Sequence, residues 1–134
     1  MTVWRETEEV GLWGAFKAFE VLGLKHGMAS RLGGVSEGQL GSLNLGFLAE
    51  PESPENVSEN RQNFLKQIGL KAENLATYRQ VHGDRIVRAH EPINSMVEAD
   101  AVVTNVPELA LLVLAADCVP IVLVDPIRRA IGVA

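Results

Sequence analysis

The chain has 134 residues, of which 47% are hydrophobic and 22% charged, enough apolar material for one domain of ordinary size with a buried core. Its net charge of -5 excludes a general positive field for nucleic acid or an anionic membrane, so we expect neither as a partner. One cysteine excludes an internal disulfide, and neither an export signal nor a bilayer-spanning apolar run is found, which predicts a cytoplasmic protein.

The first third of the chain gives weak signals of secondary structure. Residues 10–25 are apolar with scattered small residues, a pattern that does not separate helix from strand. Residues 29–38 read as a glycine-rich loop, because glycine pairs permit positive φ and close backbone approach. Residues 41–46 continue this irregular path.

A helix is predicted from about Pro54 to Ile68. Ser53 is a good N-cap, proline suits the first helical position, and Gly69 is a typical C-terminal stop. The apolar residues recur at helical spacing and define one face: Val57, Phe64, Leu65 and Ile68.

The remaining residues favour strands. Residues 76–82 are predicted to form a strand that turns at Gly83-Asp84 into a second strand over 85–89. The run 109–115 is continuously apolar, which indicates a strand buried on both faces. Three further strands are predicted over 101–104, 121–124 and 130–133, the last two joined by 125–129. We therefore predict an α+β fold with mixed β-sheets flanked by helices, in a single domain over 1–134.

Two residues stand out as candidates for chemistry. Cys118 follows the most apolar predicted strand, and His82 sits at the predicted turn. A lone cysteine there is often a small buried hydrophobe, and a lone histidine at a turn often faces solvent. Imidazole and thiolate together suit zinc or copper, and the same pair also fits a cysteine nucleophile with a histidine base. Spacing alone does not decide among these.

Six segments in order give a more specific signal. The series closely resembles the YfiH family, also called the laccase-domain, polyphenol-oxidase or peptidoglycan-editing-factor family, from about His26 to the end of the chain. The segments are Ser30-Arg31-Leu32-Gly33-Gly34-Val35-Ser36, Ser42-Leu43-Asn44-Leu45-Gly46, Asn60-Arg61, Gln80-Val81-His82-Gly83, Ala99-Asp100-Ala101 and Ala116-Asp117-Cys118-Val119-Pro120.

The resemblance implies a zinc-dependent purine nucleoside phosphorylase that splits adenosine, inosine and methylthioadenosine with phosphate and also deaminates adenosine. It implies that His82 and Cys118 are metal ligands. The family's third ligand is the histidine of a His-Ala-Gly-Trp-Arg-Gly segment, and this sequence stops at Ala134, just before that segment would begin. We therefore expect a chain that is cut short within the fold and inactive by itself.

Substrate-binding candidates follow from the same reaction. Phosphorolysis needs an anion site, for which Arg31, Arg61 and the glycine-rich loop are candidates, although Arg61 also fits a plain surface charge. Asn44 and Gln80 have amides suited to a purine or ribose. The alternatives are a cysteine hydrolase using Cys118 and His82, a copper polyphenol oxidase, and a non-enzymatic domain that pairs through a strand edge. A homodimer is compatible with each of them.

Overall fold

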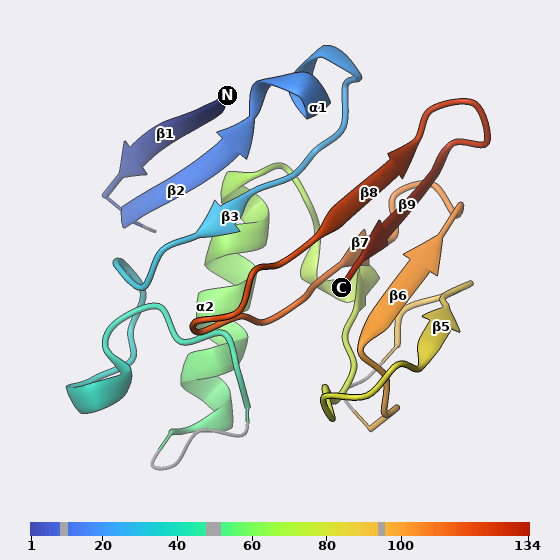
Figure 1. The fold of residues 1–134 in the computed structure, drawn as a ribbon. Coiled ribbons are helices and arrows are strands. Elements are labelled where there is room, and N and C mark those ends of the chain that lie inside the picture. The colour runs from blue at the N-terminus through green and yellow to red at the C-terminus, as the bar shows by residue number, and fades with distance from the viewer. Residues whose placement is uncertain (9–10, 48–51, 94–95) are drawn as a thin grey trace. The chain divides into compact units, whose positions relative to one another are not determined.

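The computed structural model describes residues 1–8, 11–47, 52–93 and 96–134 (Figure 1). The chain divides into two compact units, residues 1–72 and 73–134, and each is described by itself. The fold is α+β with several small sheets and few helices, as predicted. That the whole chain forms a single domain stays a prediction.

The first unit contains an antiparallel sheet in the order β1-β2-β3 (Figure 1). The region whose secondary structure the sequence left open forms β2 and a short helix, with Val10 outside the described residues. The elements of this unit are β1 (Thr2–Thr7), β2 (Gly11–Phe16), α1 (Lys17–Val21), β3 (Met28–Ala29), the 3-10 turn η1 (Gly38–Leu40) and α2 (Pro54–Gln67).

Helix α2 forms for the reasons that its sequence indicates. The Ser53 hydroxyl accepts a hydrogen bond from the Asn56 backbone N–H at 3.1 Å, and Pro54 occupies the first turn. Gly69 follows the helix with a φ of +73°, a left-handed conformation that glycine adopts without strain. The predicted helix is therefore confirmed to within a residue at its C-terminus.

The buried face of α2 packs against β2. Trp13 and Phe64 meet edge to face with ring centroids 6.5 Å apart, in a cluster completed by Ala15 and Leu43. The face predicted from helical spacing is the one that is buried, but Asn60 and Arg61 are buried with it. These two polar residues require partners inside the unit.

The second unit contains a two-stranded parallel sheet, β4-β7, and a four-stranded mixed sheet in the order β5-β6-β9-β8 (Figure 1). Its elements, after the 3-10 turn η2 (Ala72–Asn74), are β4 (Leu75–Ala76), β5 (Ile86–Arg88), β6 (Ala101–Thr104), β7 (Ala110–Leu111), β8 (Val122–Asp125) and β9 (Ala130–Val133). The predicted strands over 101–104, 121–124 and 130–133 are confirmed to within one residue.

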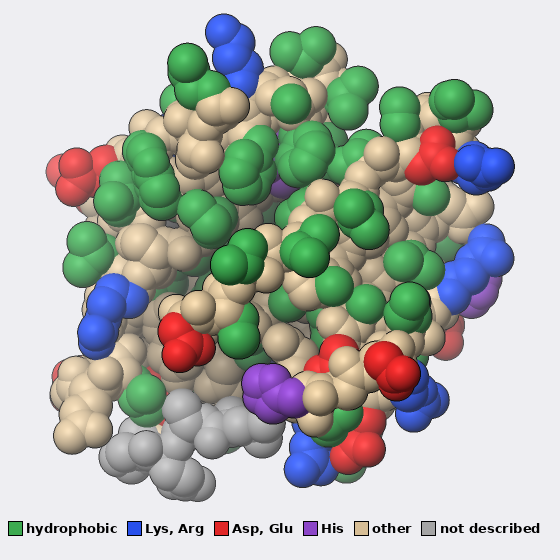
Figure 2. Space-filling view, viewed as in Figure 1, with side chains coloured by type: hydrophobic (Ala, Val, Ile, Leu, Met, Phe, Trp, Pro, Cys, Tyr) green, Lys and Arg blue, Asp and Glu red, His purple; other side chains and the backbone are tan. Residues whose placement is uncertain are grey.

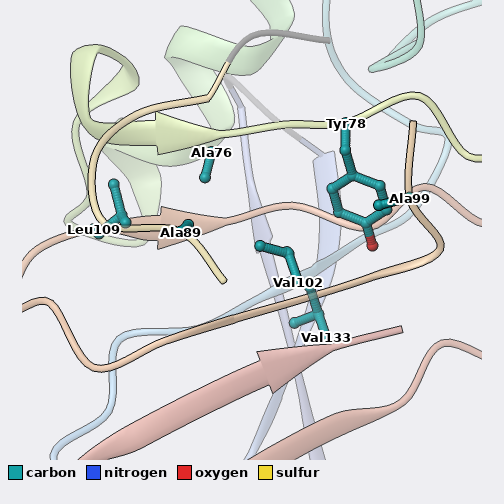
Figure 3. Close-up of a cluster of buried hydrophobic side chains, with 7 residues drawn as sticks. All are labelled: Ala76, Tyr78, Ala89, Ala99, Val102, Leu109 and Val133. Atoms are coloured by element: carbon teal, nitrogen blue, oxygen red, sulfur yellow. The ribbon is translucent and has the colours of Figure 1, made fainter. Parts of the chain in front are cut away.

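A second buried cluster fills the interior of this unit (Figure 3). Tyr78 lies beside Ala99, and Val102 of β6 meets Val133 of β9, its partner in the ladder (Figure 3). The buried Tyr78 hydroxyl has no hydrogen-bond partner among the described residues, and burial, followed by the charge of Asp100, raises the pKa of Tyr78.

The predicted hairpin at Gly83-Asp84 is wrong. Of the predicted strand over 76–82, only Ala76 belongs to a sheet, as the end of β4, and Arg79 forms an isolated bridge with Glu98. Strand β5 pairs in parallel with β6 rather than with the preceding segment. The backbone N–H groups of Thr77 and Arg79 bond the carbonyls of Ile93 and Val97 instead. Long-range partners have therefore replaced the local turn pairing that the dipeptide suggested.

The predicted strand over 109–115 is also corrected. Only Ala110–Leu111 pairs with β4, residues 111–114 are half-buried, and residues 115–118 are exposed. Apolar composition predicted a strand covered on both faces, but residues 112–114 lie outside the ladder and are only half-buried.

Apolar side chains also remain on the outside of the second unit. Ile121 and Leu123 on the β8 edge are more than half exposed, and Figure 2 shows hydrophobic side chains gathered over the region of β8 and β9. Among the described residues, no helix has the length and apolar character needed to cross a bilayer.

Candidate functional site

His82 lies in an exposed loop that is held by one carboxylate. The Asp100 side chain accepts hydrogen bonds from the backbone N–H groups of Val81 at 2.9 Å, His82 at 2.7 Å and Gly83 at 2.8 Å. His82 itself has a φ of +57°, which non-glycine residues seldom adopt. The loop is therefore shaped by a side chain and not by a ladder of backbone bonds.

The surroundings of Asp100 favour the ionised form of its carboxylate. Partial burial acts to raise its pKa, but the N–H groups of Gly83, Val81 and His82, together with the nearby imidazole charge, lower the pKa below its ordinary value. A charged acceptor makes each of these bonds stronger than a neutral one would. Asp100 is consequently a firm anchor for the His82 loop at neutral pH.

Cys118 lies in an exposed bend that follows β7. Its thiol is solvent-accessible, and its recorded contact is with the Asp117 carboxylate at 4.0 Å. The sequence placed this cysteine at the end of a buried strand, whereas the structure places it seven residues beyond the last strand residue, Leu111. Within this unit, Cys118 is therefore not the small buried hydrophobic residue that a lone cysteine often is.

Gln80 joins the segment that leads to His82 to the segment that leads to Cys118. Beyond the β4-β7 pair, the Gln80 amide donates to the Leu114 carbonyl at 3.0 Å and accepts from the Leu114 N–H at 2.8 Å. The two segments thus run side by side in the same direction from Leu75 and Ala110. His82 and Cys118 follow the same end of this parallel pair, two and four residues after the amide bridge.

The donor chemistry of this end suits a soft or borderline metal. An imidazole nitrogen and a thiolate sulfur are both ordinary zinc ligands, and copper takes the same donors. In the ranges that the structure describes, no group of three or more His, Cys, Asp or Glu side chains converges on one point. His82 and Cys118 are thus of the donor types that zinc takes, and the described part of the chain adds no third donor beside them.

The candidate anion-binding residues lie in the first unit. Arg31 is exposed, and its guanidinium donates to the backbone carbonyl of Gly41 at 2.7 Å and of Gln39 at 3.2 Å. The Arg31 carbonyl in turn accepts from the N–H groups of Ser42 and Leu43. Arg31 thus closes the glycine-rich loop onto the 41–46 segment.

Arg61 is not a surface charge, although its position on a helix was compatible with one. Its side chain is buried, donates from Nε to the Leu45 carbonyl at 2.7 Å, and stacks its guanidinium 4.4 Å from the ring centre of Phe47. Burial lowers the pKa of Arg61 to about 10, so the group is charged at neutral pH. A buried cation of this kind is a reasonable anion-binding group.

The amides of Asn44 and Gln80 already have partners. Asn44 donates to the Gly46 carbonyl and the Glu52 carboxylate, both at 3.1 Å, and accepts from the Gly46 N–H. Both polar atoms of the Gln80 amide bond Leu114. A role for either amide in holding a purine or ribose stays a prediction, and their present contacts are structural.

Sequence reasoning did not assign roles to Asp100 and Asn60. Asn60 is fully buried, accepts from the Val35 N–H at 2.8 Å, and donates to the Ser36 hydroxyl and the Asn44 carbonyl, both at 2.9 Å. Each residue sits within one of the six segments that carry the family resemblance. A polar residue on the apolar face of a helix was the available signal for Asn60.

Comparison with known proteins agrees with the resemblance. Residues 25–134 match the family described as multi-copper polyphenol oxidoreductase laccase. The purine nucleoside phosphorylase of Deinococcus radiodurans is 38% identical over 113 residues, which cover 84% of this chain and 43% of that protein. The chain therefore spans less than half the length of this relative.

Solved structures give the same picture of the fold. YlmD from Geobacillus stearothermophilus matches with a TM-score of 0.75 and 29% identity, and the YfiH protein of Bacillus licheniformis with 0.74 and 28%. Each match covers 81% of this chain and 43% of the other.

Proposed function

Because the chain belongs to the multi-copper polyphenol oxidoreductase laccase family, we propose that it forms part of a zinc-dependent purine nucleoside phosphorylase. The name of the Deinococcus radiodurans relative, at 38% identity, supports this reaction. The proposed metal site is supported by one observation. Two parallel segments are joined by the hydrogen bonds between Gln80 and Leu114, and His82 and Cys118 follow these segments at the same end.

In this reaction inorganic phosphate replaces the purine at the ribose C1′. A carbon–oxygen bond forms to the phosphate as the glycosidic carbon–nitrogen bond breaks, and the purine leaves with the electron pair and takes up a proton. The products are the free base and ribose 1-phosphate, or 5-methylthioribose 1-phosphate where the substrate is methylthioadenosine. We propose adenosine, inosine and methylthioadenosine as substrates, and deamination of adenosine as a second reaction.

The second unit would hold the metal. His82 contributes an imidazole nitrogen and Cys118 a thiolate, both on exposed segments that a ligand can reach. A bound zinc ion supplies Lewis-acid polarisation of the substrate or a lowered pKa for a water molecule. The donors suit either metal, and zinc is preferred to copper in this proposal because the named reaction transfers no electrons and needs no redox-active ion.

The first unit would contribute groups that bind phosphate. Arg61 is buried and charged, and its Nε donates to a backbone carbonyl, so its guanidinium is the proposed group for binding an anion. Arg31 lies on the glycine-rich loop, whose Gly33 and Gly34 both have positive φ. Consecutive backbone N–H groups in such loops are typical anion-binding elements.

The metal proposal is tested by zinc content and zinc affinity of the purified chain. We expect His82→Ala and Cys118→Ser to lose most of the bound zinc, because each removes one of the proposed donors. His90→Ala is the matched control, since His90 is another exposed histidine of the same unit. Unchanged zinc content in both donor variants would refute the proposal.

Placed in a protein that also supplies the family's third-ligand histidine, the same variants separate the phosphorylase from a cysteine hydrolase. Release of hypoxanthine from inosine that depends on phosphate and is abolished by a chelator supports the phosphorylase. Zinc that shields the exposed Cys118 thiol from alkylation supports its role as a ligand. Hydrolysis that persists in chelator and is lost in Cys118→Ser would support the hydrolase instead. A cytoplasmic location and a homodimer stay predictions.

A further inference from the structure

Asp100 accepts three hydrogen bonds from the backbone around His82, the residue proposed to bind the metal. They come from the residue before His82, from His82 itself and from the residue after it, at 2.9, 2.7 and 2.8 Å. Three consecutive N–H groups point into one carboxylate, with Oδ1 taking two and Oδ2 the third. The direction of the peptide planes on both sides of His82 is thereby fixed.

The backbone at His82 needs such an anchor. Its φ of +57° lies in the left-handed region, which an L side chain occupies only when its surroundings hold it there. Gly83 allows the close approach, because a Cβ at this position would lie 3.3 Å from Asp100 Oδ2. Without the carboxylate, these three N–H groups have no acceptor recorded in the described part of the chain, and the loop would relax to ordinary conformations.

Asp100 is itself held by regular structure. Its backbone N–H bonds the Arg85 carbonyl at 2.9 Å, the same carbonyl accepts from Ala101 at 3.2 Å, and β6 begins at Ala101. The preceding Ala99 is fully buried. The carboxylate therefore extends from the start of a packed strand to the loop that contains His82. A regular element can in this way position a metal-ligating residue that lies on a loop.

We propose that Asp100 is a positioning residue that holds the His82 backbone in the conformation that presents its imidazole to the metal. This proposal rests on the proposed role of His82 as a ligand. Asp100 acts through the peptide groups around His82 and does not touch the metal. Its loss should therefore weaken metal binding while His82 and Cys118 are both still present.

The test compares zinc dissociation constants of Asp100→Ala, Asp100→Asn and His82→Ala in the full chain, measured by competition with a chromogenic chelator. Asp125→Ala is the matched control. Asp125 also accepts two backbone N–H groups, from Ile127 at 3.0 Å and Arg128 at 2.9 Å, but in the turn that joins β8 to β9. We expect Asp100→Ala to weaken zinc binding about 10–100-fold, as for outer partners of metal ligands.

Asp100→Asn keeps the shape and one carbonyl oxygen, so it should restore part of the affinity and fall between wild type and Asp100→Ala. Asp125→Ala should leave the zinc dissociation constant unchanged even if it lowers thermal stability. A loss of zinc affinity in Asp125→Ala equal to that in Asp100→Ala would overturn the proposal, because the effect would then be general destabilisation.

Amide hydrogen exchange in the metal-free chain tests the geometry independently of zinc. The amides of residues 81–83 should exchange about tenfold faster in Asp100→Asn than in wild type, with β6 unchanged. Equal exchange at these amides refutes the anchoring role itself. If exchange rises but zinc affinity is insensitive to His82→Ala, then His82 is not a ligand, and the proposed function and this inference fail together. If His82→Ala weakens binding and Asp100→Ala does not, only the present inference fails.

Discussion

Replacement of Asn60 by alanine is the most direct test of how α2 holds the glycine-rich loop. Asn60 is fully buried, and its amide bonds three groups at 2.8–2.9 Å: the Val35 N–H, the Ser36 hydroxyl and the Asn44 carbonyl. A fourth contact, to the Ser42 carbonyl at 3.4 Å, is too long to add much. The variant removes all of them and leaves their partners unsatisfied.

The expected magnitude follows from these contacts. Each of the three short bonds contributes about 0.5–1.5 kcal/mol net, which gives about 1.5–4.5 kcal/mol together. Alanine is the better helix former by about 0.6 kcal/mol, which offsets a small part of the loss. We therefore expect Asn60→Ala to lower the free energy of unfolding of the first unit by about 1–4 kcal/mol.

The assay is urea unfolding followed by tryptophan fluorescence. Trp13 is 4% exposed and packs on Phe64, so its emission reports the first unit. Asn63→Ala is the control, because Asn63 is on the same helix and its side chain makes no hydrogen bond to the described residues; it measures the propensity gain alone. If Asn60→Ala is no less stable than Asn63→Ala, then the amide does not hold the loop and the reasoning is refuted.

Three further outcomes are expected. Gly34→Ala should destabilise the first unit more than Gly38→Ala, by about 2 kcal/mol in the same urea assay, because both have positive φ but only a Cβ at Gly34 meets the buried asparagine, at 2.5 Å. Equal effects would exclude the clash as the cause. Gln80→Ala should lower the stability of the second unit by about 1–3 kcal/mol and speed hydrogen exchange at Leu114, whose N–H and carbonyl it leaves unpaired; unchanged exchange would contradict the bridge. The pKa of Asp125 is lowered by hydrogen bonds within the β8-β9 turn, and those from Arg128 have the largest effect. The ionised Asp125 therefore stabilises the fold fully above the unfolded-state pKa, and this stabilisation is lost as pH falls through the folded-state pKa. Acid unfolding monitored by circular dichroism should therefore show less pH dependence below about pH 4 in Asp125→Asn than in wild type, and identical acid profiles would argue against it.

Local sequence determined the elements whose stabilising contacts are local. Helix α2 was predicted because its cap, its first-turn proline and its terminal glycine act within a few residues of the helix. The β8-β9 pair was predicted because two apolar runs are joined by residues 125–129. The structure shows that this turn is also held locally, since the Asp125 side chain accepts from the N–H groups two and three residues on. The six segments further identified His82 and Cys118 as candidates, although no spacing between them carries a motif.

Only the tertiary structure decided how those candidates are held. Asp100 binds the His82 backbone across 18 residues of sequence, Gln80 meets Leu114 across 34, and Asn60 reaches Val35 across 25. Side-chain bonds of this range leave no periodic trace in the sequence, because each depends on where two remote segments pack. The same contacts replaced the hairpin that Gly83-Asp84 suggested, since a carboxylate at the start of β6 satisfies N–H groups that a turn would have used. His82 and Cys118 were thus predictable from the sequence as candidate ligands, whereas packing determined the conformation in which they are held.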